Sequence, residues 1–239
     1  MVPLYRVVHA RVLDGLARGE WKPGDRLPSE SELARRFGVA VFTIRAGISE
    51  LVVANVLVRK QGKGTFVASH AHTRAPFTYM RVYHNSGAKL VAQRSLLSMK
   101  KERADAETVA RLQLDRGRSQ RVYRMVFLLS TERGPVAVHD VAVPVAMIRG
   151  LKRAPLRTQD NLYAIYQDHG IYVVRREEQV RAVKASAAVA HALGIKPGVP
   201  VLEVRRVAYT YDGKPVEFLI RSFEATQHYY SWNQAGNST

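Results

Sequence analysis

The residues of this chain with the clearest chemical potential are basic side chains around two glycines. The stretch RKQGKGTFV, residues 59–67, follows the apolar run VLV and ends in a second one, TFV. Two short apolar runs around a glycine-containing tip are typical of a β-hairpin. The stretch lacks the GxxxxGK[ST] pattern of a phosphate-binding loop. Two interpretations remain here: a solvated turn, or a wing in which Arg59, Lys60 and Lys63 bind nucleic-acid phosphates.

Three predicted helices come before this hairpin, and the first two have clear end signals. Apolar residues recur at helical spacing from Tyr5 to Leu16, which predicts a first helix that Gly19 ends. A Pro-Gly turn follows, and then PSESELARRFG predicts a second helix. Its S-x-x-E spacing is that of a capping box, in which two side chains satisfy backbone N–H groups reciprocally. Gly38 is expected to end this helix in a left-handed conformation.

A third helix is predicted over residues 41–53, with Asn55 closing it in a left-handed conformation. Phe42, Arg45 and Ser49 would then share an outward face of this helix, beside the basic hairpin. A helix that presents side chains to base edges, next to a hairpin that reaches a neighbouring groove, is a winged helix-turn-helix. The order of the elements therefore favours the wing over the solvated turn.

Residues 5–67 resemble the DNA-binding domain of the GntR family of bacterial transcription regulators. The motifs that carry the resemblance are PGDRLPSESELARRFGV, TIR-x-x-I-x-x-L and QGKGTFV. It implies a homodimer that reads a short two-fold-symmetric operator in double-stranded DNA, with the third helix in the major groove and the wing tip in the minor groove. The family usually has Ser-Arg-x-Thr where residues 40–43 read AVFT. The arginine that commonly reads guanine is therefore absent.

The predicted DNA-contacting residues come from the capping box, the third helix and the wing. Thr43, Arg45, Gln61 and Gly62 match the family motifs, and the resemblance carries DNA contact over to them. The other predicted residues occupy neighbouring positions in the same elements. The full set is Ser29, Ser31, Val41, Phe42, Thr43, Arg45, Lys60, Gln61, Gly62 and Lys63.

The rest of the chain contains an internal repeat. AETVARLQLDRG (106–117) aligns without gaps with AAVAHALGIKPG (187–198), and in the same register Arg124 falls on Arg205. Each copy reads as helix, turn, strand, hairpin and strand, and a further helix over 161–170 separates the copies. This order predicts an α+β domain with an antiparallel sheet and pseudo-symmetric architecture.

This second region resembles the UTRA effector-binding domain of the HutC subfamily of GntR regulators, whose fold is that of chorismate lyase. The motifs include A-x-x-V-A-x-x-L-x-L, GPVAV, LGIKPG and DGKPVE, and the resemblance covers nearly all of residues 76–235. It implies that a small anionic or polar metabolite binds between the two copies, held by Arg and Glu side chains on strands. The predicted effector-binding residues are Arg124, His139, Asp140, Tyr163, Glu217 and Arg221.

Within this set, Arg124 matches the first arginine of an Arg-x-Arg motif in the family, and Glu217 matches the acid that follows Pro-Val. We hypothesise that Arg124 grips the anionic end of the effector and that Glu217 fixes its polar end. A guanidinium offers a planar fork that suits a carboxylate or a phosphate. The alternative for each of these residues is an exposed salt bridge between strands.

The composition restricts the class of protein to which the chain can belong. The chain has 37 Lys and Arg against 20 Asp and Glu, a formal charge of +17, which favours polyanionic partners. It has no cysteine and no apolar run long enough to cross a membrane. We expect a bacterial cytoplasmic protein that is nucleoid-associated when bound to DNA. The eight histidines are scattered, and His70 and His72 lie in a polar segment without other ligands, so neither a metal, a cofactor nor catalysis is expected.

The predicted organisation is a winged helix-turn-helix domain (1–68), a linker (69–78), a UTRA-like effector-binding and dimerisation domain (79–235) and a tail (236–239). The predicted function is that of a ligand-responsive, sequence-specific DNA-binding transcription regulator, a repressor released by its effector. Two alternatives stay open: a general architectural DNA-binding protein, and an enzyme of the chorismate-lyase-like fold. A large ratio of specific to non-specific affinity would distinguish a regulator from an architectural protein.

Overall fold

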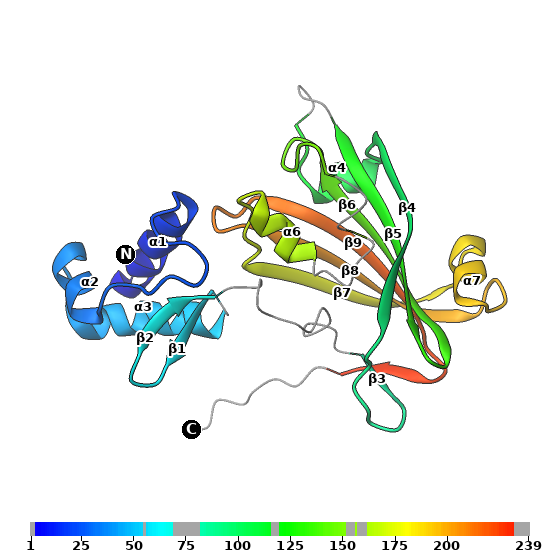
Figure 1. Ribbon diagram of the computed structural model, residues 1–239, viewed down its shortest axis with the longest axis horizontal. Coiled ribbons are helices and arrows are strands. Elements are labelled where there is room, and N and C mark those ends of the chain that lie inside the picture. The colour runs from blue at the N-terminus through cyan, green and yellow to red at the C-terminus, as the bar shows by residue number, and fades with distance from the viewer. Residues whose placement is uncertain are drawn as a thin grey trace.

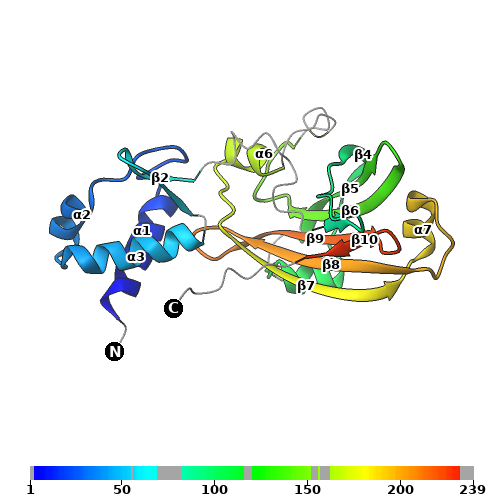
Figure 2. The same cartoon turned by 90° about the horizontal axis from the view of Figure 1, so that it is seen from below.

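The computed structural model describes residues 3–54, 56–68, 82–115, 120–151, 156 and 162–231. A small helical domain lies at one end of the molecule, next to a larger domain built on a twisted antiparallel sheet (Figures 1 and 2). The predictions made for Asn55, for the linker with its two histidines and for the tail fall outside the described residues. No helix in the described part of the chain has the length and apolar character needed to span a bilayer.

The small domain has the predicted order of a winged helix-turn-helix. Three helices, α1 (Leu4–Ala17), α2 (Glu30–Phe37) and α3 (Val41–Val53), precede a hairpin of β1 (Leu57–Lys60) and β2 (Gly64–Val67). Buried apolar side chains from all of these elements form one core. α1 and α3 approach so closely that a Cβ on Gly47 would lie 2.8 Å from the backbone oxygen of Tyr5.

The ends of α2 confirm the capping prediction, whereas α3 begins without a cap. The Ser29 hydroxyl accepts a hydrogen bond from the backbone N–H of Glu32, and the Glu32 carboxylate accepts one from the backbone N–H of Ser29 at 2.7 Å. Gly38 ends α2 with φ of 68°, in the left-handed region. Ala40 precedes α3 and has no side chain that could bond its first N–H groups.

The larger domain contains one six-stranded sheet in the order β4-β5-β6-β9-β8-β7, in which all neighbours are antiparallel. A short pair, β3 with β10, lies apart from it. Among the described residues, the helices α4, α6 and α7 pack on the sheet (Figure 1). The bounds are β3 (Val82–His84), β4 (Gln93–Arg103), α4 (Ala106–Arg111), β5 (Arg121–Thr131), β6 (Gly134–Pro144), α6 (Leu162–Asp168), β7 (Arg175–Lys184), α7 (Ala187–Leu193), β8 (Pro200–Tyr209), β9 (Pro215–Glu224) and β10 (His228–Tyr230).

The internal repeat is confirmed as two copies of one unit. The first copy is β4-α4-β5-β6 and the second is β7-α7-β8-β9, and the copies meet where β6 pairs with β9. Each helix packs across the junction, since α4 contacts β9 and α7 contacts β6. The two copies are therefore joined by both a strand pair and a reciprocal exchange of helices.

The register predicted for the repeated strands is wrong by two residues. The last residues of β4 and β7 pair with Arg121 and Pro200, respectively, so these two residues are equivalent. Arg124 therefore corresponds to Glu203 and not to Arg205. The gapless alignment holds for α4 and α7, but the connection from helix to strand is two residues longer in the first copy.

The two faces of the sheet have different coverings. The face covered by α6, called the inner face here, carries the largest core of the protein (Figure 2). The opposite face, called the outer face, packs against α4 and α7. Because successive strand residues point to opposite faces, the paired residues His139 and Arg221 lie on the inner face, whereas Asp140 and Ile220 lie on the outer face.

Candidate nucleic-acid interface and effector site

The outward face of α3 is apolar in its first turn and basic in its second. Phe42 is 76% exposed and Val41 is also exposed, and Arg45 follows one turn later. The helix thus presents the predicted face of Phe42, Arg45 and Ser49. Thr43 is only 6% exposed and points into the domain, so the structure does not support the DNA contact predicted for its side chain.

Glu30 connects the predicted reading helix to the wing. Its carboxylate accepts a hydrogen bond from Nε of Arg45 at 2.9 Å and one from Arg59 at 3.5 Å. Arg59 also donates to the Ser49 hydroxyl at 3.2 Å. Sequence reasoning missed Glu30 as an organising residue. Its signal in the sequence was its place directly after the N-cap Ser29, in the first turn of α2.

The wing presents three exposed polar side chains around a left-handed tip. Gly62 has φ of 68° and Gly64 has φ of 109°, so the turn requires residues without a Cβ. Lys60, Gln61 and Lys63 are exposed at this tip. Ser29 and Ser31 are exposed at the start of α2, and a shallow cavity of about 400 Å³ separates this helix start from the wing. The predicted residues other than Thr43 therefore gather on one side of the domain.

On the inner face of the larger domain, a carboxylate is buried with an arginine. Glu217 is completely buried and accepts hydrogen bonds from Arg206 at 2.7 Å and from the Tyr166 hydroxyl at 2.8 Å. Tyr166 belongs to α6, so this bond fastens the helix to the sheet. Burial is the main reason why the pKa of Tyr166 is raised well above its usual value, and Glu217 adds to the effect.

Arg221 lies beside this pair and lacks part of its hydrogen bonding. The side chain is 4% exposed, and its Nε and Nη1 have no partner among the described residues. Burial and the neighbouring Arg206 lower the pKa of Arg221 to about 10, which leaves the guanidinium charged at neutral pH. A buried, charged and incompletely bonded guanidinium is costly unless something else completes its bonds.

His139 faces Arg221 across the β6–β9 pair and is held neutral. Burial, reinforced by Arg221, Arg206 and Arg94, lowers the pKa of His139 well below its usual value. Its Nε2 also lacks a partner among the described residues. Tyr163 of α6 closes the same region, and burial raises the pKa of its phenol to about 12. The inner face thus brings together four of the predicted effector residues: His139, Tyr163, Glu217 and Arg221.

The other two predicted residues lie on the outer face. Arg124 donates to Asp140 at 2.9 Å and to Asp105 at 2.5 Å, and its Nε lies 3.0 Å from the Glu102 carboxylate. These three acids, of which Asp105 is the N-cap of α4, neutralise its charge. Arg124 and Glu217 are separated by the thickness of the sheet, so the hypothesis that they grip one effector is wrong. The alternative, a salt bridge between strands, describes Arg124.

Sequence reasoning missed Arg206 and Tyr166 as members of the inner-face site. The signal for Arg206 was its alternation with Val204 and Ala208, which places a charge at an inward position of β8. Tyr166 lies one helical turn after Tyr163, and their rings are 5.8 Å apart. Among the residues that the structure describes, no three His, Asp or Glu side chains gather as metal ligands would.

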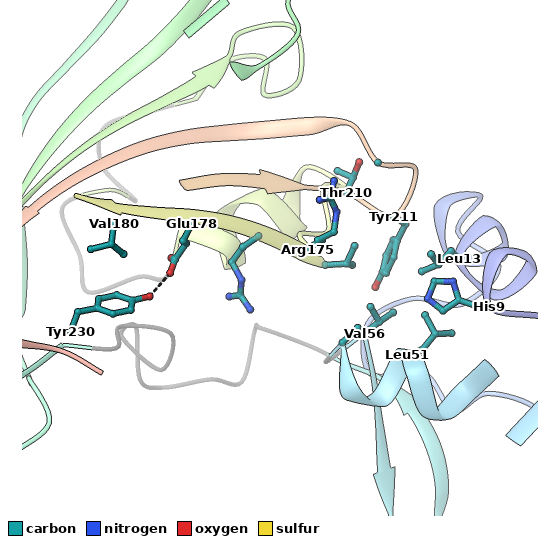
Figure 3. Close-up of a pocket in the computed structure, with 14 residues that line it drawn as sticks. His9, Leu13, Leu51, Val56, Arg175, Glu178, Val180, Thr210, Tyr211 and Tyr230 are labelled. Carbon is teal, nitrogen blue, oxygen red and sulfur yellow. Dashed lines mark hydrogen bonds between the residues drawn. The ribbon is translucent and has the colours of Figure 1, made fainter. Parts of the chain in front are cut away.

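A contact joins the two domains at the turn between β8 and β9. Tyr211 in this turn and Val174 ahead of β7 pack against the apolar core of the winged domain. Figure 3 shows the Tyr211 ring directed toward α1 and the end of α3, at the side of a cavity of about 1110 Å³. Tyr172 supports this ring at a centroid distance of 6.0 Å, and burial raises the pKa of the Tyr211 phenol. The segment that follows α6 therefore reaches the winged domain.

Comparison with known proteins agrees with both halves of this description. Residues 4–67 match the bacterial regulatory proteins of the gntR family, and residues 88–228 match the UTRA domain. The chain is 31% identical over 214 residues to the histidine utilization repressor of Pseudomonas putida, covering 89% of this chain and 84% of that protein. It is 25% identical over 229 residues to the mannosyl-D-glycerate transport/metabolism system repressor of Escherichia coli, covering 96% and 95%.

Solved structures show the same fold. The ligand-binding domain of a regulator from Bordetella bronchiseptica, assigned to the GntR family, aligns with a TM-score of 0.58 and 29% identity over 65% of this chain and 96% of its own. PhnF from Mycobacterium smegmatis aligns with a TM-score of 0.53 and 23% identity over 95% and 99%. Fold and matches together define a ligand-responsive, DNA-binding transcription regulator. The chain belongs to the GntR family and carries a UTRA domain.

Proposed function

We propose that this regulator is a repressor that leaves its operator when an anionic small molecule binds on the inner face of the sheet, at Arg221. The carrying observation is the buried Arg221 guanidinium, whose Nε and Nη1 have no partner among the described residues. Buried polar groups in proteins are nearly always hydrogen-bonded, so an unpaired donor of this kind calls for a partner. A carboxylate or a phosphate group matches the planar fork of a guanidinium.

The neighbours of Arg221 favour an anion over a neutral ligand. Arg206 adds a second positive charge, and the carboxylate of Glu217 is already bonded to Arg206 and Tyr166. A second carboxylate, Glu178, lies 3.9 Å from Arg206 and accepts a hydrogen bond from the Tyr230 hydroxyl. His139 is neutral and offers a ring nitrogen for a further hydrogen bond. The repressors that this chain resembles are named for different compounds, so their names do not indicate one effector.

We propose that this site binds its ligand without transforming it. Glu217 would be the natural general base, but both of its oxygens accept short hydrogen bonds inside the protein. A base must reach the proton that it removes, and this carboxylate is held by its own neighbours. The energy of ligand binding is then available to shift the protein between two conformations.

Coupling to DNA runs, in this proposal, through α6. An anion at Arg221 competes with the contacts that fasten α6 through Tyr166. The segment after α6 carries Tyr172 and Val174, which meet Tyr211 and the winged domain. A shift of α6 therefore changes the contact that orients the DNA-binding domain. Effector binding can change operator binding in this way only if the effector has different affinities for the two orientations of the winged domain.

The proposed assembly is a homodimer on a two-fold-symmetric stretch of double-stranded DNA, joined through the second domain. We propose the domain limits 1–68, 69–78, 79–235 and 236–239, which are supported by the two family matches falling inside the first and third ranges. A dimer presents two reading helices, and the spacing of its half-sites follows from that geometry. Light scattering of the free protein and of its operator complex measures the number of chains.

The test of the proposed function is a screen for ligands that release DNA. An operator is first selected from random duplexes with the full-length protein. Carboxylated, phosphorylated, neutral and cationic metabolites are then compared by the shift in melting temperature and by loss of operator binding. We expect the compounds that do both to be anions. A neutral or cationic compound that releases the operator equally well would contradict the proposal, and so would release that does not depend on Arg221.

A further inference from the structure

We propose that Phe42 gives this regulator part of its base specificity by packing against the 5-methyl group of a thymine in each operator half-site. The inference rests on operator binding through α3 and adds the chemical group that α3 recognises. Its starting observation is the Phe42 side chain, which is 76% exposed in the first turn of α3, whereas Thr43 and Ile44 next to it are buried. An exposed aromatic ring of this size contributes nothing to the packing of the domain.

The position of Phe42 makes it a reading residue. It occupies the first turn of α3, where Thr43 and Ile44 point inward and are buried. The outward residues of this turn are Val41 and Phe42, both apolar. Recognition helices of this class contact base edges with residues near their N-terminus. The leading edge of this helix therefore meets the major groove with carbon atoms rather than with donors or acceptors.

The chemistry of the major groove then restricts the partner. Each base pair shows hydrogen-bonding groups there, and the one apolar group among them is the C5 methyl of thymine, which apolar side chains such as Phe contact. Val41 beside Phe42 extends the apolar surface. Next to a guanine or a cytosine the same ring would cover the polar edge of the base. That edge would lose its hydrogen bonds to water and gain none from the ring, which lowers affinity.

The surroundings of Phe42 favour DNA over a protein partner for this exposed ring. Arg45 lies one turn further along the same face, and Arg59 joins it through Glu30. Lys60 and Lys63 of the wing are exposed on the same side of the domain. Basic side chains around an apolar reader hold the phosphates while the reader meets the bases.

The experiment removes the methyl group and nothing else. Operators are selected from random duplexes with the full-length protein, and each thymine of the strongest site is replaced singly by deoxyuridine, which lacks only the C5 methyl. We expect the dissociation constant to rise about fourfold for replacement at either of two symmetry-related positions, one in each half-site, the change that corresponds to one buried methyl-sized group. Other replacements should leave it within the error of the measurement.

The same titrations with Phe42→Ala complete the test as a double-mutant cycle. In this variant, thymine and deoxyuridine operators should bind equally, and both more weakly than the parent complex. The matched control is Val53→Ala, which trims another strongly exposed apolar side chain, 83% exposed, at the far end of the same helix. It should keep the full difference between thymine and deoxyuridine.

Three outcomes would overturn the inference. They are selected operators that contain no fixed thymine, a parent protein that binds every deoxyuridine operator as tightly as the original, and a methyl effect that survives in Phe42→Ala. Each of these leaves operator selection itself intact, so the regulator assignment would stand. Failure to enrich any sequence would instead contradict the proposed function, and the two kinds of failure are distinguishable in the first step.

Discussion

The first copy of the repeat presents Phe127, Ala137 and Val141 to the inner face, and all three are fully buried in the apolar core. At the equivalent positions the second copy presents Arg206, Glu217 and Arg221, which are also buried. The equivalence follows from strand pairing, because each hairpin has its bulge at the same place before the turn. The two copies thus have the same strand arrangement but differ in the polarity of the side chains at three equivalent positions.

This difference indicates that apolar side chains at the three positions are sufficient for this arrangement of strands. The first copy builds its half of the sheet with hydrocarbon side chains alone at these positions. Burying the charges of the second copy requires removing water from them, which costs free energy. A protein in which well-packed apolar side chains replace a buried ion pair is often at least as stable as the original. The shared strand arrangement therefore does not require charges at these three positions, although Glu217 also holds α6 through Tyr166. The proposed effector gives a reason for the charges.

The largest effect is expected when the charged set is broken. Glu217→Ala, which installs the residue of the first copy, leaves Arg206 buried without its carboxylate and should lower the free energy of unfolding by about 3–5 kcal/mol. The variant Arg206→Phe with Glu217→Ala restores the apolar pair of the first copy and should recover most of that loss. Urea denaturation measures both. A single variant as stable as the parent, or a double variant no better than the single one, would show that the copies are not comparable.

A smaller effect is expected from Arg221→Val, which installs the counterpart of Val141. The variant should bind an anionic effector about 10–100-fold more weakly, the range that corresponds to lost hydrogen bonds to a charged group. Its free energy of unfolding should not fall, because a buried charge is replaced by an apolar side chain of the kind that the first copy uses. Isothermal titration and urea denaturation give the two numbers. Unchanged effector affinity would remove Arg221 from the site.

The exception to the pattern, His139, gives a pH-dependent prediction. Its counterpart in the second copy is Leu219. Because burial lowers the pKa of His139 well below its usual value, the unfolded chain binds a proton that the folded chain does not. The free energy of unfolding is therefore unaffected by His139 well above a pH of about 6.5. It decreases as the pH falls below that value, by at most about 1.4 kcal/mol per pH unit. His139→Leu should remove that part of the slope, measured by unfolding at pH 7.5, 6.5 and 5.5. An identical slope in both proteins would contradict it.

The smallest effect is expected on the outer face. Arg124→Ala removes a partly exposed side chain that bonds Asp105 and Asp140, and should lower the free energy of unfolding by about 1 kcal/mol. Effector affinity and operator release should stay at parental values, in contrast to Arg221→Val. This variant is the matched arginine control for the inner face. Loss of the effector response would instead restore Arg124 to the ligand site.

Local signals predicted most of the winged domain. The capping box at Ser29, the left-handed Gly38 and the helix over residues 41–53 all depend on short-range spacing, and the structure has each of them. Thr43 is the exception, because which side of a helix faces the core depends on where α1 packs. The pairing of Glu30 with Arg45 and Arg59 likewise needs the three-dimensional approach of α2, α3 and the wing.

Less of the second domain could be predicted from the sequence alone. The repeat predicted the topology, but the longer connection after α4 shifts the strands by two residues, and a gapless alignment cannot show that. A shift of two keeps every residue on its face, so the inward position of Arg206 was already visible in the alternation of β8. What sequence could not show is which face of the sheet α6 covers, and the structure places Arg221, and not Arg124, on that face.

The reciprocal exchange of helices between the copies has a consequence for synthesis on the ribosome. β6 is finished at Pro144, yet its neighbour β9 begins only at Pro215. At the usual speed of translation, β6 waits roughly 4–14 s for that strand, with an unpaired edge and an apolar face that has no cover. The helix that packs on it, α7, also arrives late. We therefore expect the nascent first copy to expose an unpaired strand edge, and a ribosome stalled after β6 to hold a fragment prone to aggregation.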